Sequence, residues 1–412
     1  MNFFNYVDDE LYVEDVPVKR LAEKFKTPLY IYSANTLRRH FRVFDDAFGD
    51  VKHMICFAMK SNSNLSVLKL FTKMGAGFDI VSGGELFRAI KAGAPGNKIV
   101  YSGVGKTTNE ISEALKADIL MFNVESFQEL NVINEIAGSM NKVARISVRI
   151  NPDVDPKTHP KISTGLKANK FGIDINRVIN DYEEARKLKN IEVVGVDFHI
   201  GSQITELAPF VDTLERIKEL VFQLRERGFD IRYFDIGGGL GITYQDEEPP
   251  DPTEYAAAIK KIANELDVIF ILEPGRVIVG NAGILLTEVL YTKQAEKNFV
   301  VVDAGMNDLL RPAMYDAFHK IIPVAKTDGP KIIADVVGPI CESADFLAKN
   351  REMTDAKRGD LLAVMSAGAY SFSMASNYNS RPRAAEVMVD GSDFVVVRQR
   401  ETYEDLILHE GG

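Results

Sequence analysis

Three side chains that can take part in covalent or acid–base chemistry each follow a short apolar run of the sequence. Lys60 follows MICFAM, His199 follows VVGVDF and Glu273 follows VIFIL. A lysine partly removed from water has a lowered pKa, and its free amine is then a nucleophile for Schiff-base chemistry. The alternative for Lys60 is a side chain that reaches the surface along its apolar stem. His199 is either a core histidine or a flat ring suited to stacking on a planar cofactor.

A glycine run and a carboxylate add to this set. Gly237, Gly238 and Gly239 offer backbone N–H groups at close approach with no Cβ in the way. Such a run can bind phosphate, and a plain turn is the alternative. Glu273 would be costly if it were buried without a partner. A cation such as a protonated pyridine would satisfy it, and an ion pair with Arg276 is the alternative.

An amine, a phosphate-binding turn, a flat ring and a carboxylate are together the groups that bind pyridoxal phosphate (PLP). Asp79, Ser202 and Gly275 follow the same or neighbouring apolar runs and join the candidate site. No single residue is decisive. The prediction of a PLP site depends on all of them meeting at one rim of the fold.

Eight apolar runs, each followed by a helical pattern, can supply that rim. The runs are nearly continuous in apolar residues, as is typical of parallel strands covered on both faces. Eight strands alternating with helices over about 220 residues predict a (β/α)₈ barrel, whose sites lie at the carboxyl ends of the strands. A doubly wound open sheet is the main alternative. The predicted strands are 53–59, 78–81, 99–101, 119–122, 143–150, 193–199, 231–236 and 268–272.

The pattern changes after about residue 280, where strand-like runs follow one another with few helices between them. We therefore predict a PLP-binding barrel over 33–279 and a mostly β C-terminal domain over 280–412. The N-terminal segment 1–32 contains a strand-like run at 28–32 that is a candidate to join the β domain. The connection 151–172 is polar and has three prolines, and loops of this length are usually functional lids or disordered.

Composition narrows the class of protein. There are 49 basic and 59 acidic residues, a formal charge of −10, which disfavours nucleic acid as a partner. Two cysteines, Cys56 and Cys341, cannot form a disulfide framework or a zinc cluster, and we expect no metal. No apolar run approaches 18 residues and the N-terminus has no signal pattern. We therefore expect a cytoplasmic protein with no membrane partner.

Seven motifs occur in the order known from one family. The chain resembles diaminopimelate decarboxylases, which are PLP enzymes of the alanine-racemase fold, from about residue 28 to 385. CESxD, residues 341–345, separates this family from its relatives better than the PLP motifs do. The motifs are FAMKSN (57–62), HIGSQ (199–203), DIGGGLG (235–241), EPGR (273–276), RPAMY (311–315), CES (341–343) and GAY (368–370).

The resemblance implies roles for individual residues. Lys60 would hold PLP covalently, His199 would stack on its ring and Glu273 would pair with the ring nitrogen. Cys341 would donate a proton to the carbon that loses CO₂, and in this family Cys341 and Glu342 reach the site from the partner subunit of a homodimer. The other implied cofactor-binding residues are Asp79, Ser202, Gly238, Gly239, Gly275, Arg276 and Tyr370. The implied substrate-binding residues are Arg276, Arg311, Tyr315, Glu342 and Tyr370.

The resemblance also implies the reaction, the decarboxylation of meso-2,6-diaminopimelate to L-lysine and CO₂, which is the last step of lysine biosynthesis. The nearest alternative is a decarboxylase of ornithine, arginine or carboxynorspermidine. Arg311 and Glu342 argue against it, because a distal carboxylate needs a cation and a distal amine needs an anion. A racemase would need a second base where Cys341 delivers one proton. A regulatory homologue without activity is a further alternative, against which the intact Lys60 and Cys341 argue.

Overall fold

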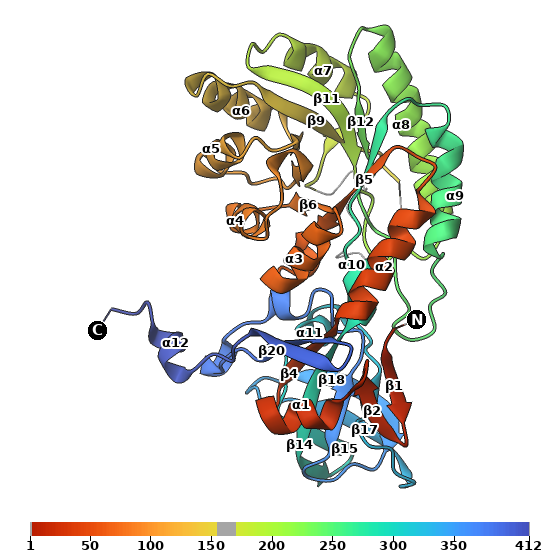
Figure 1. Cartoon of the computed structure of the whole chain (residues 1–412), viewed down its shortest axis with the longest axis vertical. Helices are drawn as coiled ribbons and strands as arrows, with labels where there is room; N and C mark the ends of the chain where they lie inside the picture. Colours follow the sequence, from red (N-terminus) through yellow and green to blue (C-terminus); the bar gives the residue numbers. More distant parts are fainter. Residues whose placement is uncertain (1, 155–169, 412) are drawn as a thin grey trace. The chain divides into compact units, whose positions relative to one another are not determined.

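The chain divides into two units in this computed structural model, which describes residues 2–154 and 170–411 (Figure 1). The barrel unit comprises Phe41–Ile242 and Glu248–Val277. The β unit comprises Met1–His40, Thr243–Glu247 and Ile278–Gly412, so it draws on both ends of the chain.

Eight parallel strands form a closed ring in the barrel unit. They follow one another around the ring in chain order, β13 pairs with β5, and β8 pairs with β9. This closure confirms the predicted (β/α)₈ barrel and excludes the open doubly wound sheet. The strands are β5 (His53–Ala58), β6 (Gly77–Ile80), β7 (Ile99–Tyr101), β8 (Met121–Val124), β9 (Ala144–Asn151), β11 (Ile191–Phe198), β12 (Tyr233–Asp235) and β13 (Ile269–Leu272).

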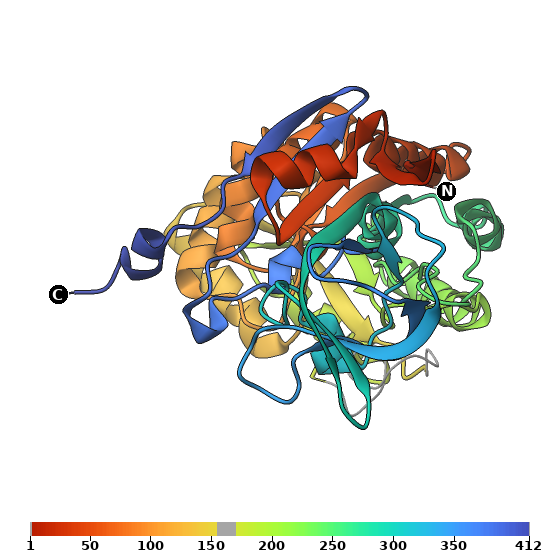
Figure 2. The same ribbon diagram turned by 90° about the horizontal axis from the view of Figure 1, so that it is seen from below.

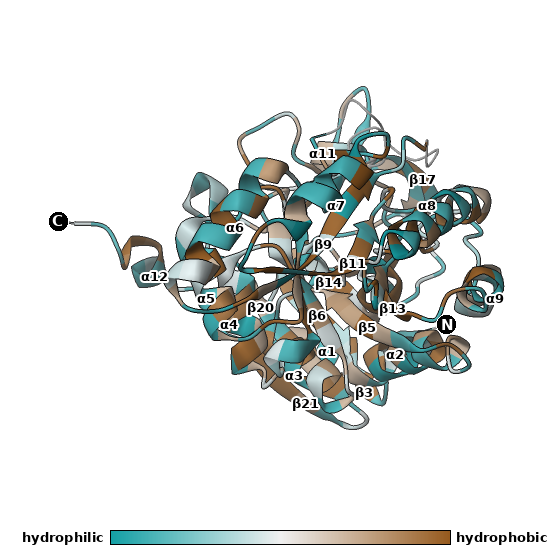
Figure 3. Ribbon diagram, turned by 90° about the horizontal axis from the view of Figure 1, so that it is seen from above, coloured by the Kyte–Doolittle hydropathy of each residue, from teal (hydrophilic) through white to brown (hydrophobic). Residues whose placement is uncertain are grey.

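Helices surround the ring of strands, as Figure 3 shows. After β9 the short strand β10 (Ile173–Asp174) extends the ladder before the next helix begins. The chain enters the barrel through α2 (Ala34–Ala47) and leaves it through α10 (Arg276–Val279). The helices between the strands are α3 (Leu65–Lys73), α4 (Gly83–Lys91), α5 (Thr108–Lys116), α6 (Phe127–Ser139), α7 (Val178–Arg186), α8 (Ala208–Glu226) and α9 (Pro252–Ala263).

The barrel interior is apolar below its carboxyl rim. Cys56, Val100, Met121 and Ile271 belong to one buried cluster contributed by different strands. Burial raises the pKa of the Cys56 thiol well above its ordinary value, so this cysteine is an inert core residue. Because these apolar side chains fill the interior, the side chains that can do chemistry are expected at the ends of the strands.

The β unit is built around a sheet in the order β18-β17-β15-β14-β4-β20-β21, which confirms the mostly β C-terminal part. β4 (Leu29–Ser33) lies between β14 and β20 and pairs with both, so the N-terminal run is a central strand of this sheet. Figure 2 shows these N- and C-terminal segments side by side. The other strands are β14 (Gly283–Gln294), β15 (Asn298–Val302), β16 (Ile321–Pro323), β17 (Lys331–Val337), β18 (Phe346–Thr354), β19 (Leu361–Val364), β20 (Ala385–Asp390) and β21 (Asp393–Arg398).

Smaller elements complete the β unit. The N-terminal sheet contains β1 (Phe4–Val7), β2 (Glu10–Val13) and β3 (Val16–Pro17), and the short helices are α1 (Val18–Phe25), α11 (Arg311–Tyr315) and α12 (Tyr403–Ile407). In the part of the chain that the structure describes, no helix is both long and apolar enough to cross a membrane. Most of the predicted 151–172 lid lies outside the described residues.

Candidate active site

Lys60 lies at the carboxyl end of the first barrel strand. It sits in a single 3₁₀ turn, Met59–Ser61, directly after β5, and its Nζ forms an ion pair with Asp79 Oδ2. Ala58 and Asp79 are register partners on β5 and β6, so the ladder itself places this carboxylate beside the amine. The side chain of Asp79 is fully buried, whereas that of Lys60 is 35% exposed. The amine thus reaches from a buried strand to the open rim.

His199 follows β11 and is held as a neutral ring. The Gly238 N–H donates to His199 Nδ1 at 3.2 Å, so Nδ1 is an acceptor and the ring proton lies on Nε2. Burial, together with the positive charges of Arg149 and Lys60, lowers the pKa of His199 well below its ordinary value. The ring therefore stays flat and uncharged at neutral pH, as a stacking surface requires.

The glycine run at 237–239 turns sharply where β12 ends. Gly237 has φ +64° and Gly239 has φ +119°, values that side-chain-bearing residues rarely adopt. A Cβ on Gly238 would lie 2.2 Å from the carbonyl oxygen of Glu273, so only glycine allows the ends of β12 and β13 to approach this closely. At this run the chain turns, and its backbone also lies close to the backbone of Glu273.

Glu273 belongs to a group of three buried carboxyl groups with Asp197 and Asp235. One oxygen of each lies within 4.8 Å of the others. Burial, and then the neighbouring charge of Asp235, raises the pKa of Glu273 well above its ordinary value. Within residues 2–154 and 170–411 no ion pair holds Glu273, so a bound cation would stabilise its ionised form.

Two arginines stand near this rim. Arg149 Nη1 forms an ion pair with Glu125 Oε1 at 2.7 Å, and both side chains are buried. Arg276 Nη2 donates to Ser202 Oγ at 3.0 Å. The contact between Arg276 and Ser202 joins the segments that follow β13 and β11. Arg276 therefore bonds to a hydroxyl group here, whereas the sequence offered an ion pair with Glu273 as the alternative.

These residues fit the groups of PLP. Asp79 Oδ1 is buried and has no hydrogen-bond partner within residues 2–154 and 170–411, so the rim holds an acceptor that a bound group can satisfy. Glu273 is suited to a protonated ring nitrogen, and the glycine run to a phosphate. The barrel residues that the resemblance implies to bind the cofactor, Lys60 and His199 among them, lie at the carboxyl ends of strands. Tyr370, which is implied as well, belongs to the β unit.

Arg311 opens α11 in the β unit and is only 7% exposed. Its Nη1 contacts His319 Nε2 at 2.7 Å, and its guanidinium carbon lies 4.5 Å from the centre of the Tyr244 ring. His319 is held from the other side by a contact of Nδ1 with the carbonyl oxygen of Met365 at 2.8 Å. A buried arginine oriented by an imidazole and an aromatic ring is suited to binding a carboxylate.

Two other residues of the β unit, Tyr315 and Tyr370, are half-buried. Tyr315 is the last residue of α11, and Tyr370 adopts φ +54°. A non-glycine residue in this region is uncommon and costs of order 1 kcal/mol or more, and such residues are found mostly at functional sites. The GAY motif therefore holds its tyrosine in a strained position.

Cys341 and Glu342 lie in an exposed loop after β17. The Cys341 N–H donates to Asn379 Oδ1 at 2.8 Å, and Tyr378 Oη donates to Glu342 Oε2 at 2.7 Å. Asp345 fixes the loop from within by accepting from Ile340 N at 2.6 Å. These bonds hold the backbone of the loop, while the side chains of Cys341 and Glu342 are exposed.

The sequence predictions did not assign a role to several supporting residues. In the barrel these are Asn123, Glu125 and Asp197; in the β unit they are Tyr244, His319, Tyr378 and Asn379. Asp197 could have been found, because a charged residue inside the apolar run VVGVDF is unusual unless it is paired or functional. His319 and Tyr244 gave no such signal, because they reach Arg311 from distant parts of the chain.

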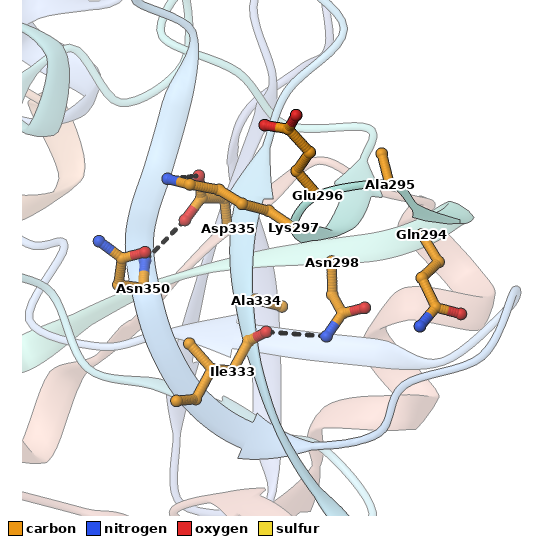
Figure 4. A pocket seen from close by; sticks show the side chains of 9 residues that line it. All are labelled: Gln294, Ala295, Glu296, Lys297, Asn298, Ile333, Ala334, Asp335 and Asn350. Carbon is orange, nitrogen blue, oxygen red and sulfur yellow. Dashed lines mark hydrogen bonds and ion pairs between the residues drawn. The ribbon is translucent and has the colours of Figure 1, made fainter.

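A hollow of about 300 Å³ lies elsewhere in the β unit, at the β14–β15 turn and beside β17 (Figure 4). Its lining is polar, but Lys297 Nζ pairs with Asp335 Oδ2 at 3.4 Å and Asn350 N donates to Asp335 Oδ1 at 2.6 Å. Lys297 and Asp335 thus already pair with each other, which leaves Glu296 as the other charged residue of the lining. The hollow does not compete with the barrel rim as the active site.

Comparison with known proteins first gives the class of protein to which this chain is similar. A family model described as "Pyridoxal-dependent decarboxylase, pyridoxal binding domain" matches residues 34–280. The diaminopimelate decarboxylase of Haemophilus influenzae is 54% identical over 409 residues, covering 98% of this chain and 98% of its own.

Solved structures agree with that similarity. Diaminopimelate decarboxylase from Helicobacter pylori, complexed with L-lysine, superposes with a TM-score of 0.93 at 45% identity, covering 95% of this chain and 98% of its own. The enzyme from M. jannaschii, in co-complex with L-lysine, gives 0.95 at 39%, covering 99% and 98%. This chain therefore belongs to the diaminopimelate decarboxylase family of pyridoxal-dependent decarboxylases, which confirms the resemblance seen in its motifs.

Proposed function

We propose that this chain is a PLP-dependent carboxy-lyase that converts meso-2,6-diaminopimelate to L-lysine and CO₂, the last step of lysine biosynthesis. The observation that carries the proposal is the barrel rim, where Lys60 and Glu273 close a site next to a glycine turn. Full-length similarity of about 50% to diaminopimelate decarboxylases points to the substrate.

The barrel residues hold the cofactor. Lys60 would bind PLP covalently, and His199 would stack its neutral ring on the face of the cofactor. Glu273 would accept a hydrogen bond from the ring nitrogen. PLP, when bound, supplies an electron sink for the negative charge left on the substrate carbon when CO₂ departs. The other residues assigned to the cofactor, most of them at its phosphate, are Asp79, Ser202, Gly238, Gly239, Gly275, Arg276 and Tyr370.

The β unit supplies substrate recognition. Arg311 is suited to the distal carboxylate, because its planar guanidinium is already oriented and can bind it in a forked manner. Glu342 is suited to the distal ammonium. Tyr315, Tyr370 and Arg276 complete the predicted contacts.

Cys341 is the proton donor in this proposal. Its Sγ–H delivers a proton to the carbon that has lost CO₂, and the product becomes L-lysine. Its exposed position in the described chain gives the thiol access to a substrate, in contrast with the buried Cys56.

A homodimer follows from the same residues. Cys341 and Glu342 are exposed in one chain, as expected if they complete the site of a second copy. Apolar side chains on α4 are also exposed, Phe87 by 62% and Ile90 by 49%, and would be covered in a dimer. We further propose a cytoplasmic location and neither nucleic acid nor membrane as a partner, in line with the acidic composition.

Turnover with three substrates tests the function. The purified protein with PLP should release CO₂ from meso-diaminopimelate with kcat/KM at least about 10³-fold above that for ornithine or arginine, because leaving Arg311 without its carboxylate is costly. Arg311→Met should remove most of this preference, whereas Arg358→Met, on the exposed surface of the same unit, should not. Faster turnover of ornithine by the unaltered protein would contradict the proposal.

A further inference from the structure

The three buried carboxyl groups of the barrel are brought together by the register of adjacent strands. Asp197 on β11 is the direct register partner of Asp235 on β12. Asp235 in turn faces Ile271 on β13, and Glu273 follows two residues later on the same face. The crowding is therefore built into the ladder and does not depend on flexible side chains.

The three groups differ in the hydrogen bonds they accept. Asp235 accepts from Gly237 N–H and from Asn123 Nδ2, each at 3.0 Å. Asn123 is itself oriented by Ser147, whose hydroxyl donates to Asn123 Oδ1 at 2.6 Å. Glu273 accepts a long contact of 3.4 Å from Ser102 Oγ and shares a side-chain hydrogen bond with Asp235, but it accepts no N–H donor among the hydrogen bonds of the described residues. N–H donors stabilise the ionised form of a carboxylate, so Asp235 is the member best prepared to carry the negative charge.

The pKa directions agree with this order. Burial raises the pKa of Asp235 to about 7 although its two N–H donors lower it. Burial raises the pKa of Glu273 and that of Asp197 well above their ordinary values. All three carboxyl groups are thus harder to ionise than in water, and the N–H donors of Asp235 favour its ionised form.

The cations near these groups are already engaged. Lys60 is paired with Asp79, and Arg149 is paired with Glu125. The charged groups that act on the three carboxyls are Asp79, Glu125, Arg149 and Lys60, in addition to the three themselves. Two ion pairs add no net charge, so the three crowded carboxyls must share protons among themselves.

We propose that Asp235 is a positioning residue whose negative charge, held by Gly237 and Asn123, keeps a proton on the Glu273 side of the site. The charge acts through Glu273 on the ring nitrogen that Glu273 contacts, and it raises the proton affinity of that pair. Asp197 retains its own proton and separates Asp235 from Arg149. This inference rests on the proposed function, because it assumes that PLP occupies the rim.

The test is the titration of ring-¹⁵N-labelled PLP bound to the full-length protein, followed by its ¹⁵N chemical shift as a function of pH. A unit charge at about 5 Å in the protein interior shifts a pKa by a unit or more. Asp235→Asn should therefore lower the pH at which the ring nitrogen loses its proton by at least about one unit. Asp308→Asn is the matched control, because Asp308 is a buried carboxyl of the β unit with its pKa also raised to about 7. It should leave the midpoint unchanged.

A second variant keeps the test valid if Asp235→Asn does not fold. Asn123→Ala removes one donor from Asp235, favours its protonation and should move the midpoint in the same direction by a smaller amount. A midpoint equal to that of the unaltered protein in every folded variant would overturn the inference, even if PLP occupancy fell, since a merely structural role changes occupancy alone. A stoichiometric divalent cation retained by the unaltered protein and lost from Asp235→Asn would overturn it too. Failure of the unaltered protein to bind PLP would instead refute the proposed function.

Discussion

The buried carboxyl groups of the barrel rim and the loop of the β unit that carries Cys341 and Glu342 are held in opposite ways. Asp79, Asp235 and Glu273 are buried in the barrel and fixed by strand register and by bonds to neighbouring strands. Cys341 and Glu342 in the β unit are exposed; the Cys341 N–H donates to Asn379, and the Glu342 carboxylate accepts from Tyr378. Solvent-exposed bonds of this kind are weak. The carboxyl groups of the barrel rim are thus fixed within one chain, whereas the loop that carries Cys341 and Glu342 lies at the surface.

The largest expected effect comes from removing the Lys60 amine in the barrel unit. Lys60→Ala removes the amine that holds PLP, so turnover should fall by at least about 10³-fold and the visible absorbance of covalently bound cofactor should vanish. Lys52→Ala is the control, because Lys52 is an exposed lysine of the same unit, paired with Asp267. Normal turnover by Lys60→Ala would refute the scheme.

The two cysteines offer a direct comparison of the halves. Cys341→Ala should lower kcat by about 10- to 10³-fold while PLP stays bound, because it removes a proton donor and no cofactor contact. Cys56→Ala should leave kcat nearly unchanged and cost about 1–2 kcal/mol of stability, since Cys56 lies in the barrel core. Loss of cofactor from Cys341→Ala would show that the residue is structural.

The pH dependence of stability is expected to have opposite signs for a buried carboxyl group of the barrel unit and a paired one of the β unit. The folded-state pKa of Asp235 is raised, so its carboxyl ionises more readily in the unfolded chain and the ligand-free protein loses stability as pH rises from about 4 to 7. Glu401 in the β unit has a pKa lowered to about 2, chiefly by Arg383 against the effect of burial, and its contribution is lost as pH falls below about 4. Asp235→Asn should flatten the first trend by a few kcal/mol, measured by denaturant unfolding of the PLP-free protein at pH 5 and pH 8. Glu401→Gln should leave that trend in place and weaken the loss at low pH.

The smallest effect concerns the support of the exposed loop. Tyr378→Phe removes the hydrogen bond to Glu342 and should raise KM for diaminopimelate by about two- to fivefold with little change in kcat. Tyr291→Phe, at an exposed tyrosine of the same unit, is the control. A change in kcat without a change in KM would mean that Tyr378 acts on Cys341 instead of on Glu342.

The strands and the barrel could be predicted because near-continuous apolar runs and their spacing carry the signal locally. All eight predicted runs overlap a barrel strand, with ends that differ by up to two residues. The sequence also matches a capping box at Ser82-Gly-Gly-Glu85 and at Ser126-Phe-Gln-Glu129, and half of each is formed. Each serine accepts from the N–H three residues on, but Glu85 and Glu129 reach one residue further back, to Val81 N and Glu125 N.

The site could be predicted where polar residues end apolar runs, as Lys60, His199 and Glu273 do. Support that comes from side chains far away in the chain could not. His319 and Tyr244 meet at Arg311 only after the β unit has folded.

The position of β4 has a consequence for how this protein can be made and divided. Its residues 29–33 hydrogen-bond to residues that are synthesised about 250 and 350 positions later, so the ribosome must release nearly the whole polypeptide before that sheet can close. A gene fragment that starts at the barrel would leave a gap in the middle of the remaining sheet. Expression of separate halves should therefore give aggregation-prone products unless the first forty residues are supplied to the C-terminal piece.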